Sequence, residues 1–264
     1  MSSKTERENK FMDKTQLTAK IKEMVLKDID LVGITTADHL SGAPEGRRPI
    51  DVLPGAKSVI VGAIHLLDSV IEDLPYSRYE YTEQFFVLNA LLNSMTFRVS
   101  RFLESLGYRS HPVPAAYPRV NKEVCGILSH RHAAVMAGLG ELALNNMLTT
   151  PEYGARVRLV SIVTEAPLDP DHPLREERCK ELRNICKLAC VNICPVKALT
   201  PEGEIKKHVC LHYQEQIMPW SAAELRCGMC ISVCPLGKKE WLNPKSPRPK
   251  PIEDLKAKWT GAVW

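Results

Sequence analysis

At 264 residues, of which 44% are hydrophobic, the chain can form one large domain or two smaller ones. Its 35 basic and 31 acidic residues leave a net charge of only +4, too balanced to indicate nucleic-acid binding by itself. No apolar run approaches the roughly 20 residues of a membrane span, and residues 1–12 are polar, without an apolar signal segment or a twin-arginine pair. We therefore expect a cytoplasmic protein that does not enter the membrane.

The first third of the chain predicts a helix followed by two strands. Between Asp13 and Ile29, apolar residues recur at helical spacing. Leu31–Thr35 is a short strand candidate, and the glycines and prolines of Ser41–Pro49 indicate a loop. Lys57–Leu67 is rich in valine and isoleucine, which is typical of a buried strand.

The middle of the chain continues this alternation. Tyr79–Leu106 predicts a long helix or a pair of helices, closed by Gly107, and Tyr108–Val113 predicts a strand. Ser129 is suited to cap a helix over Ser129–Ala137, and the valine-rich Arg156–Thr164 predicts another strand. We therefore predict that residues 1–170 form a layered α/β (α+β) domain.

The last third of the chain is defined by its cysteines. Eight of the nine cysteines lie between residues 179 and 234, in two sets of four that each end in Cys-Pro. The first set comprises Cys179, Cys186, Cys190 and Cys194, and the second comprises Cys210, Cys227, Cys230 and Cys234. Because proline is tolerated in a first helical turn, Pro195–Leu199 is expected to begin a helix.

The spacing of these thiols is similar to that of bacterial two-cluster ferredoxins, whose C-x2-C-x2-C-x3-C-P runs each donate the last cysteine to the other cluster. We therefore predict two [4Fe-4S] clusters in a ferredoxin-like domain over residues 171–240. The crossover rule implies one cluster on Cys179, Cys186, Cys190 and Cys234, and the other on Cys210, Cys227, Cys230 and Cys194. The first set is one residue longer than the ferredoxin run, so whether Cys179 is a ligand stays open.

Two other interpretations of the cysteines compete with clusters. Two structural zinc sites use the same kind of four-thiolate set, although zinc does not require the Cys-Pro endings. A disulfide framework is typical of small secreted chains, which this sequence does not resemble. After the cysteines, residues 241–264 are expected to form a solvated tail rich in proline and lysine.

Segments before the cysteines resemble those of the epoxyqueuosine reductase and reductive dehalogenase family of corrinoid iron–sulfur enzymes. They are Arg47–Pro49 with Leu53–Val61, Ala137–Gly140, Thr149–Gly154 and Val163–Leu168, followed by His208–Tyr213 around a cluster cysteine. The resemblance covers roughly residues 45–240.

This resemblance implies a nitroreductase-like domain that binds cobalamin without a protein ligand below the cobalt. An external donor, a ferredoxin or flavodoxin, would pass electrons through the two clusters to the corrinoid, which reduces a small-molecule substrate. Glycines would let the backbone approach the flat cofactor, and Arg156 and Arg158 would meet its phosphate or amide groups. The implied cofactor-binding residues are Gly138, Gly140, Asn145, Thr150, Tyr153, Gly154, Arg156 and Tyr213. Each can equally be an ordinary turn or strand residue.

The sequence also departs from the family. The aspartate that donates a proton in epoxyqueuosine reductases has no counterpart in Val124–Ser129, and no helical-repeat domain for tRNA follows, which argues against tRNA as the substrate. Tyr117, Cys125 and His130 are the replacement proton-donor candidates. Against this, a lone cysteine is more often a small buried residue, and a histidine on a helix is more often structural or capping.

Two further functions remain open at this stage. The chain can be an electron-transfer or corrinoid-activating protein without a substrate of its own, or its first domain can hold a flavin instead of a corrinoid. The sequence predicts neither the substrate nor the oligomeric state.

Overall fold

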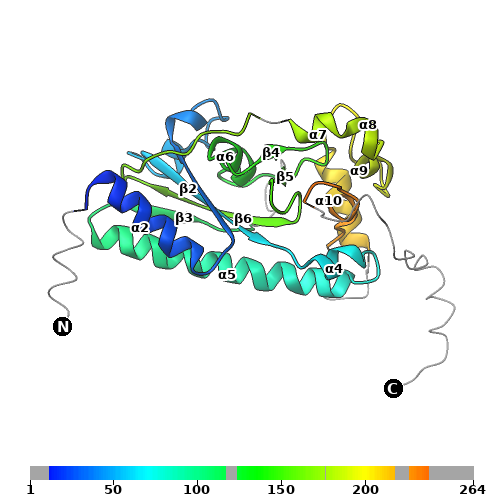
Figure 1. The fold of residues 1–264 in the computed structure, drawn as a ribbon, viewed down its shortest axis with the longest axis horizontal. Coiled ribbons are helices and arrows are strands. Elements are labelled where there is room, and N and C mark those ends of the chain that lie inside the picture. The colour runs from blue at the N-terminus through cyan, green and yellow to red at the C-terminus, as the bar shows by residue number, and fades with distance from the viewer. Residues whose placement is uncertain (1–11, 117–123, 176, 218–225, 238–264) are drawn as a thin grey trace, which may run out of the picture.

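The computed structural model describes residues 12–116, 124–175, 177–217 and 226–237. Its centre is a four-stranded sheet in the order β1-β2-β6-β3, in which every neighbouring pair is antiparallel (Figure 1). The strands are β1 (Leu31–Thr36), β2 (Ser58–His65), β3 (Ser110–Val113) and β6 (Val157–Thr164). The predicted mixture of helices and sheet is confirmed, and the antiparallel order makes the fold α+β.

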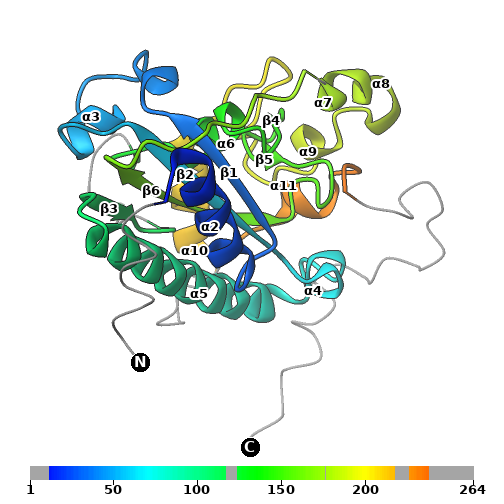
Figure 2. The ribbon, with the colours of Figure 1, turned by 60° about the vertical axis from the view of Figure 1, so that its left-hand side comes forward.

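Two helices cover one face of this sheet (Figures 1 and 2). In α2 (Lys14–Leu26), Asp13 forms a capping box with Gln16 that satisfies the first free N–H groups. The 28 residues of α5 (Arg78–Ser105) form a single helix, which settles the choice between one helix and two. Its buried face packs on apolar side chains of the strands, with Leu92, Met95, Val99 and Leu103 against Ile34, Ile60 and Ile162.

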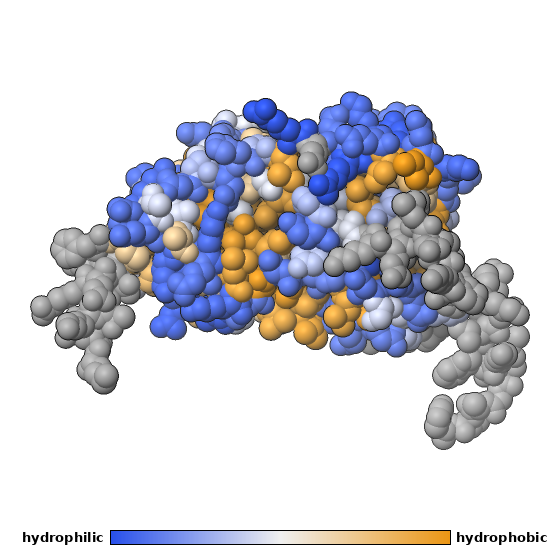
Figure 3. Space-filling model, in the orientation of Figure 1, coloured by the Kyte–Doolittle hydropathy of each residue, from blue (hydrophilic) through white to orange (hydrophobic). Residues whose placement is uncertain are grey.

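The outward face of α5 also carries large apolar residues. In Figure 3 these residues lie along the lower edge of the molecule, where α5 runs. The exposed ones are Tyr79, Phe86, Val87, Leu91 and Phe97. No described element covers this side of the helix.

The opposite face of the sheet packs on shorter elements. They are the 3₁₀ turn η1 (Asp38–Leu40), α3 (Pro49–Val52) and α6 (His130–Met136), with a two-stranded sheet of β4 (Glu141–Leu142) and β5 (Leu148–Thr149) beside them. The N-cap of α6 is Ser129, as predicted, whose side chain accepts the backbone N–H of His132. Ala133 and Ala134 of α6 are fully buried against this face of the sheet.

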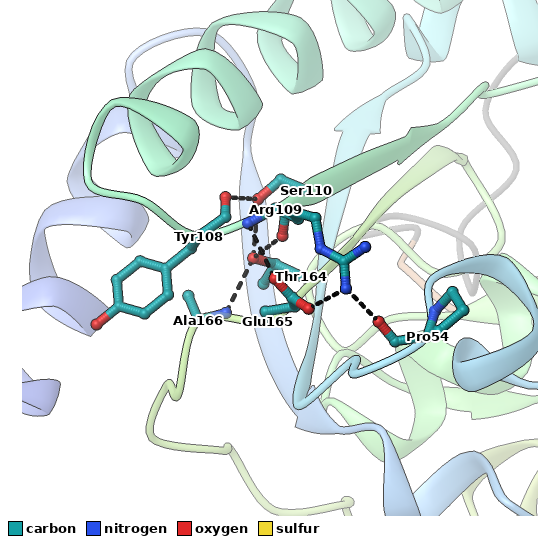
Figure 4. A network of polar contacts seen from close by, with 7 residues as sticks. All are labelled: Pro54, Tyr108, Arg109, Ser110, Thr164, Glu165 and Ala166. Carbon is teal, nitrogen blue, oxygen red and sulfur yellow. Dashed lines mark hydrogen bonds and ion pairs between the residues drawn. The ribbon is translucent and has the colours of Figure 1, made fainter.

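A polar network fixes the loops at one end of the sheet (Figure 4). Arg109 donates from Nη2 to Glu165 Oε1 at 2.5 Å and to the Pro54 carbonyl oxygen at 2.9 Å. The hydrogen bond from Arg109 lowers the pKa of Glu165. Ser110 and Thr164 share a 2.8 Å hydroxyl hydrogen bond between β3 and β6. Two of the sequence segments that carry the family resemblance therefore meet here through structural contacts.

The cysteines lie at the other end of the sheet, on short helices joined by turns (Figures 1 and 2). These are α7 (Arg178–Glu181), α8 (Arg183–Cys186), α9 (Ala189–Asn192), α10 (Lys207–Gln216) and α11 (Met229–Ser232), with α4 (Asp68–Glu72) beside α11. Among the described helices, none has the length and apolarity needed to cross a membrane. The predicted tail, residues 241–264, lies outside the described residues.

The predicted helix after Cys194-Pro195 is absent, and that prediction was wrong. Lys197 has a left-handed backbone (φ 51°), which ends the turn that Pro195 begins. Leu199 then forms a β-bridge with Ile205, and the Ala198 N–H points back to Cys194 Sγ at 3.2 Å. The Ala198 N–H is therefore used on the Cys194 thiol and not in a helical hydrogen bond.

Candidate metal and cofactor site

Four thiols from the two ends of the cysteine-rich segment line one small, mostly apolar cavity. Three come from successive short helices, α7, α8 and α9, and the fourth follows α11. These are Cys179, Cys186, Cys190 and Cys234, here called the first thiol group. Leu144 of the β4–β5 loop contributes to the wall and donates its N–H to Cys179 Sγ at 3.4 Å. The fourth thiol is therefore provided by the other half of the segment.

The remaining four cysteines influence one another electrostatically. Burial raises the pKa of Cys227, and the charges of Cys210 and Cys194 raise it as well, against an opposing effect of Arg78. Burial likewise raises the pKa of Cys230, with Cys227 as the largest thiol contribution. We call Cys194, Cys210, Cys227 and Cys230 the second thiol group. Cys190 also raises the pKa of Cys230, and the helices α9 and α11 that carry these two cysteines contact each other, so the two groups are adjacent.

The thiols lie in surroundings that disfavour free thiolates. Burial raises the pKa of Cys190 to about 11 and that of Cys234 to about 12. A metal cluster reverses this preference, because its cations stabilise the thiolate form. Within the described ranges, no three cysteine, histidine or carboxylate side chains converge tightly enough for a single metal ion. The chemistry of the donor set, four thiols around one cavity, fits an iron–sulfur cluster.

The glycines expected to cradle a flat cofactor are packed closely on the chain's own backbone. A Cβ added at Gly138, Gly140 or Gly154 would overlap the carbonyl oxygen of His172, Thr149 or Leu236, respectively. Two of them, Gly138 and Gly154, also have positive φ angles. Their lack of a side chain is therefore used for close approach of backbone to backbone.

The segment from Asn145 to Gly154 joins the sheet domain to the cysteines. Asn145 donates from Nδ2 to the Cys230 carbonyl oxygen at 3.4 Å, and it also accepts the N–H of Met147. Thr150 accepts the N–H of Tyr153, whose ring stacks on His65 with centroids 4.3 Å apart. Gly154 then packs on Leu236, two residues beyond Cys234. These predicted cofactor residues position the cysteine-rich segment.

Arg156, which was expected to meet a cofactor phosphate or amide group, is buried and paired with carboxylates of α4. Only 1% of its side chain is exposed, and Nη1 binds Asp68 and lies 3.6 Å from Glu72. Arg158 is held differently, by Asn89 and by stacking over the Phe85 ring at 4.0 Å. The last predicted cofactor residue, Tyr213, accepts a long 3.4 Å hydrogen bond from Arg78 and lies on α10, three residues after Cys210.

A second, larger cavity of about 540 Å³ adjoins the first thiol group. Cys179, Ala143 and Leu144 line both cavities, so these residues form the shared wall. The large cavity has four cations and three carboxylates, namely Arg131, Lys180, Arg183 and Lys207 with Glu141, Glu177 and Glu202. Burial raises the pKa of Glu141, which accepts the Cys179 N–H at 2.9 Å. None of these seven residues follows a sequence motif, and they come from segments far apart in the chain, so sequence reasoning missed them.

The three proton-donor candidates have different positions. Tyr117 lies outside the described residues. Cys125 Sγ is 3.0 Å from Lys207 Nζ, which lines the large cavity. His130 is turned away from that cavity: its Nε2 bonds the Pro114 carbonyl oxygen at 2.9 Å and its Nδ1 bonds Ser161 Oγ at 2.8 Å.

The contacts of His130 fix its protonation state. Because a carbonyl oxygen only accepts, Nε2 carries the hydrogen and Nδ1 accepts from the serine hydroxyl. Burial lowers the pKa of His130 to about 4, so the ring is neutral near pH 7. A neutral ring with both nitrogens engaged favours a structural role. His132, two residues on, lines the large cavity.

No family model matches the chain, but individual proteins do. Epoxyqueuosine reductase of Bacillus subtilis is 35% identical over 122 residues, which cover 43% of this chain and 30% of that protein. Tetrachloroethene reductive dehalogenase of Sulfurospirillum multivorans is 28% identical over 229 residues, covering 82% of this chain and 40% of that protein. The chain thus spans less than half the length of these two relatives.

Solved structures of the same two kinds share the fold. A reductive dehalogenase described as B12-dependent aligns with a TM-score of 0.67 at 20% identity, over 86% of this chain and 32% of that one. An epoxyqueuosine reductase bound to a tRNA stem loop aligns with a TM-score of 0.61 at 24% identity, over 90% of this chain and 70% of that one.

The α+β sheet domain is therefore a fold that this chain shares with solved structures of two kinds of reductase. The predicted resemblance is confirmed at the family level: the chain is a homologue of epoxyqueuosine reductases and reductive dehalogenases.

Proposed function

We propose that the chain is a corrinoid-dependent iron–sulfur oxidoreductase. The observation that carries the proposal is the shared wall of the two cavities. Cys179 lines the four-thiol cavity on one side and the large polar cavity on the other. A cluster held by the first thiol group would therefore lie directly beside any cofactor in the large cavity. The kinship with reductases supports a redox role for this arrangement.

The two thiol groups would hold two [4Fe-4S] clusters in the proposed enzyme. The first thiol group would hold the cluster beside the large cavity, with Cys179 as a ligand, and the second would hold the cluster that receives electrons from an external donor protein. The adjacency of Cys190 and Cys230 supports transfer between them. A zinc interpretation has no support from the relatives, and the domain boundaries at residues 170 and 240 remain a prediction.

The large cavity offers polar groups suited to the rim of a corrinoid. Arg131, Lys180, Arg183 and Lys207 can donate to its amide oxygens or phosphate, and Glu141 can accept from its amide nitrogens. When bound, such a cofactor would supply the metal-centred reduction chemistry that amino-acid side chains lack. The protein's part is then to orient the cofactor, to pair its charges and to keep a cluster at the shared wall.

The substrate has two candidates. A small molecule is the first, as in the dehalogenase relatives, whose names identify a chlorinated alkene. The second is tRNA, because a structural neighbour is an epoxyqueuosine reductase in complex with a tRNA stem loop. This neighbour supports tRNA as a candidate that the sequence-based argument had disfavoured. Neither comparison supports a flavin, and that alternative is dropped, whereas an electron carrier without its own substrate remains the competing proposal.

Anaerobic purification in the presence of cobalamin, followed by iron, cobalt and flavin quantitation, tests the proposal. The expected result is about eight irons, as two [4Fe-4S] clusters contain, and about one cobalt per chain. About eight irons with no cobalt would favour the electron carrier. Zinc in place of iron would refute the cluster assignment.

The crossover between the two thiol groups has its own test. Cys234→Ala should remove the cluster of the first thiol group and leave the second intact, so iron should fall from about eight to about four per chain. Cys125→Ala, which removes the one cysteine outside both groups, is the matched control and should keep all the iron. Loss of the cluster held by Cys227 and Cys230 in the Cys234 variant, identified by its spectroscopic signal, would overturn the crossover.

A further inference from the structure

The exposed face of α5 carries an apolar stripe that the proposed function does not use. Tyr79, Phe86, Ala90 and Phe97 recur at intervals that return to one side of a helix with 3.6 residues per turn. Phe97 is 59% exposed and Phe86 is 47% exposed, although phenylalanine is normally buried. Contiguous exposed apolar patches of this kind mark interaction surfaces.

Charges at the two ends of the stripe have opposite signs. Glu80 and Glu83 lie near the N-terminal end of α5, and Arg98 and Arg101 lie near its C-terminal end, all four exposed. Arg98 also pairs with Asp28 of the same chain, and Arg101 lies 5.9 Å from the Phe97 ring centroid. The face is therefore acidic at one end and apolar in the middle, and its other end carries the two arginines together with the exposed Glu104.

These positions are arranged symmetrically about the step from Ala90 to Leu91. Glu83 stands seven residues before Ala90, and Arg98 stands seven residues after Leu91. Glu80 and Arg101 stand ten residues away on the same two sides. An antiparallel copy of the helix would place each glutamate opposite an arginine.

The apolar residues follow this symmetry only approximately. Phe86 stands four residues before Ala90 and Phe97 stands six residues after Leu91, so across an antiparallel pair the two rings would be offset along the helix by about 3 Å, within reach of each other. Ala90 and Ser94 at the centre are small and let the two helices approach closely. A face that is complementary to itself in this way is the requirement for a two-fold interface between identical chains.

We propose that α5 is the interface of a homodimer, in which two copies of the helix pack antiparallel across a two-fold axis at the Ala90–Leu91 step. The occupant of the apolar face is a second copy of this chain. The interface lies on the side of α5 that faces away from the sheet, so it leaves both cavities accessible.

Sedimentation velocity of the purified, cluster-loaded chain tests this over a range of concentrations. The chain should sediment as a dimer, and Phe97→Ser should raise the dissociation constant at least about tenfold, as loss of a central aromatic anchor does in other interfaces. Ile50→Ser is the matched control, because Ile50 is a similarly exposed apolar residue (48%) on α3 and should leave the dimer unchanged. Iron content and the far-UV spectrum verify that each variant is folded.

A charge-swap pair tests the antiparallel orientation directly. Glu80→Arg places two arginines opposite each other in the dimer, and Arg101→Glu places two glutamates there, so each variant alone should dissociate more readily. An equimolar mixture should re-form dimers, because every cross-chain pair in the heterodimer then has opposite charges. A wild-type chain that stays monomeric, or a mixture that gains nothing over the separate variants, would overturn the proposal.

Discussion

The contact between Gly154 and Leu236 makes the strongest quantitative prediction, because it connects the sheet domain to the first thiol group. Gly154→Ala introduces two costs. A non-glycine residue at φ 56° costs about 1–2 kcal/mol. The new Cβ also overlaps the Leu236 carbonyl, and relieving such overpacking typically costs about 1–3 kcal/mol.

The expected total is about 2–5 kcal/mol, a large part of the roughly 5–15 kcal/mol that stabilises a typical domain. Gly107→Ala is the matched control, because its φ is 90° but no atom lies within 4 Å of the added Cβ. It should show only the backbone cost. Anaerobic urea unfolding, followed by far-UV circular dichroism, measures both. Because Leu236 follows Cys234 closely, the Gly154 variant should also lose iron from the first thiol group. Equal destabilisation of the two variants, with full iron, would refute the reasoning.

Two further predictions concern buried charge. Burial lowers the pKa of His130 to about 4 from an ordinary value of 6.5. Between pH 6.5 and pH 4, this histidine is therefore protonated in the unfolded chain but neutral in the folded chain. Stability should therefore fall as the pH falls from about 6.5 to about 4, and urea midpoints for His130→Gln should show a flatter dependence; an unchanged slope would contradict this. Asp68→Asn should cost about 1–3 kcal/mol, because it removes a carboxylate from the buried Arg156 while Glu72 stays nearby. Glu23→Gln, which removes exposed ion pairs with Lys20 and Lys27, should cost less than Asp68→Asn in the same unfolding assay, and equal costs would count against the buried pair.

Local sequence patterns were sufficient to find the main elements of the sheet domain. The uninterrupted apolar run of β2 fits a strand whose residues Ser58–Ile64 are buried on both faces, and Ser129 caps its helix because its hydroxyl accepts a backbone N–H. The order of the strands was not accessible in this way. β6 inserts between β2 and β3, and this pairing depends on contacts between segments that are far apart in the chain.

In the candidate site, too, the features with a local sequence pattern could be predicted, whereas those that depend on distant contacts could not. The spacing of the cysteines predicts a shared metal centre, because neighbouring ligands must reach one centre from a short stretch of chain. A glycine in a motif is ambiguous, since it can make room for a ligand or for another backbone, and only the position of Leu236 shows that Gly154 does the latter. Arg156 is ambiguous in the same way, because its carboxylate partner lies on a different element. The charged walls of the large cavity have no local signal at all.

The first thiol group has a consequence for how the protein is made. Three of its thiols leave the ribosome together, but the fourth, Cys234, is synthesised 44 residues after Cys190. A nascent chain that ends before this residue has an open ligand set, whatever the folding state of its sheet domain. A cluster held by the first thiol group would therefore be completed only after Cys234 has been synthesised, so its presence would show that the chain has been made at least that far.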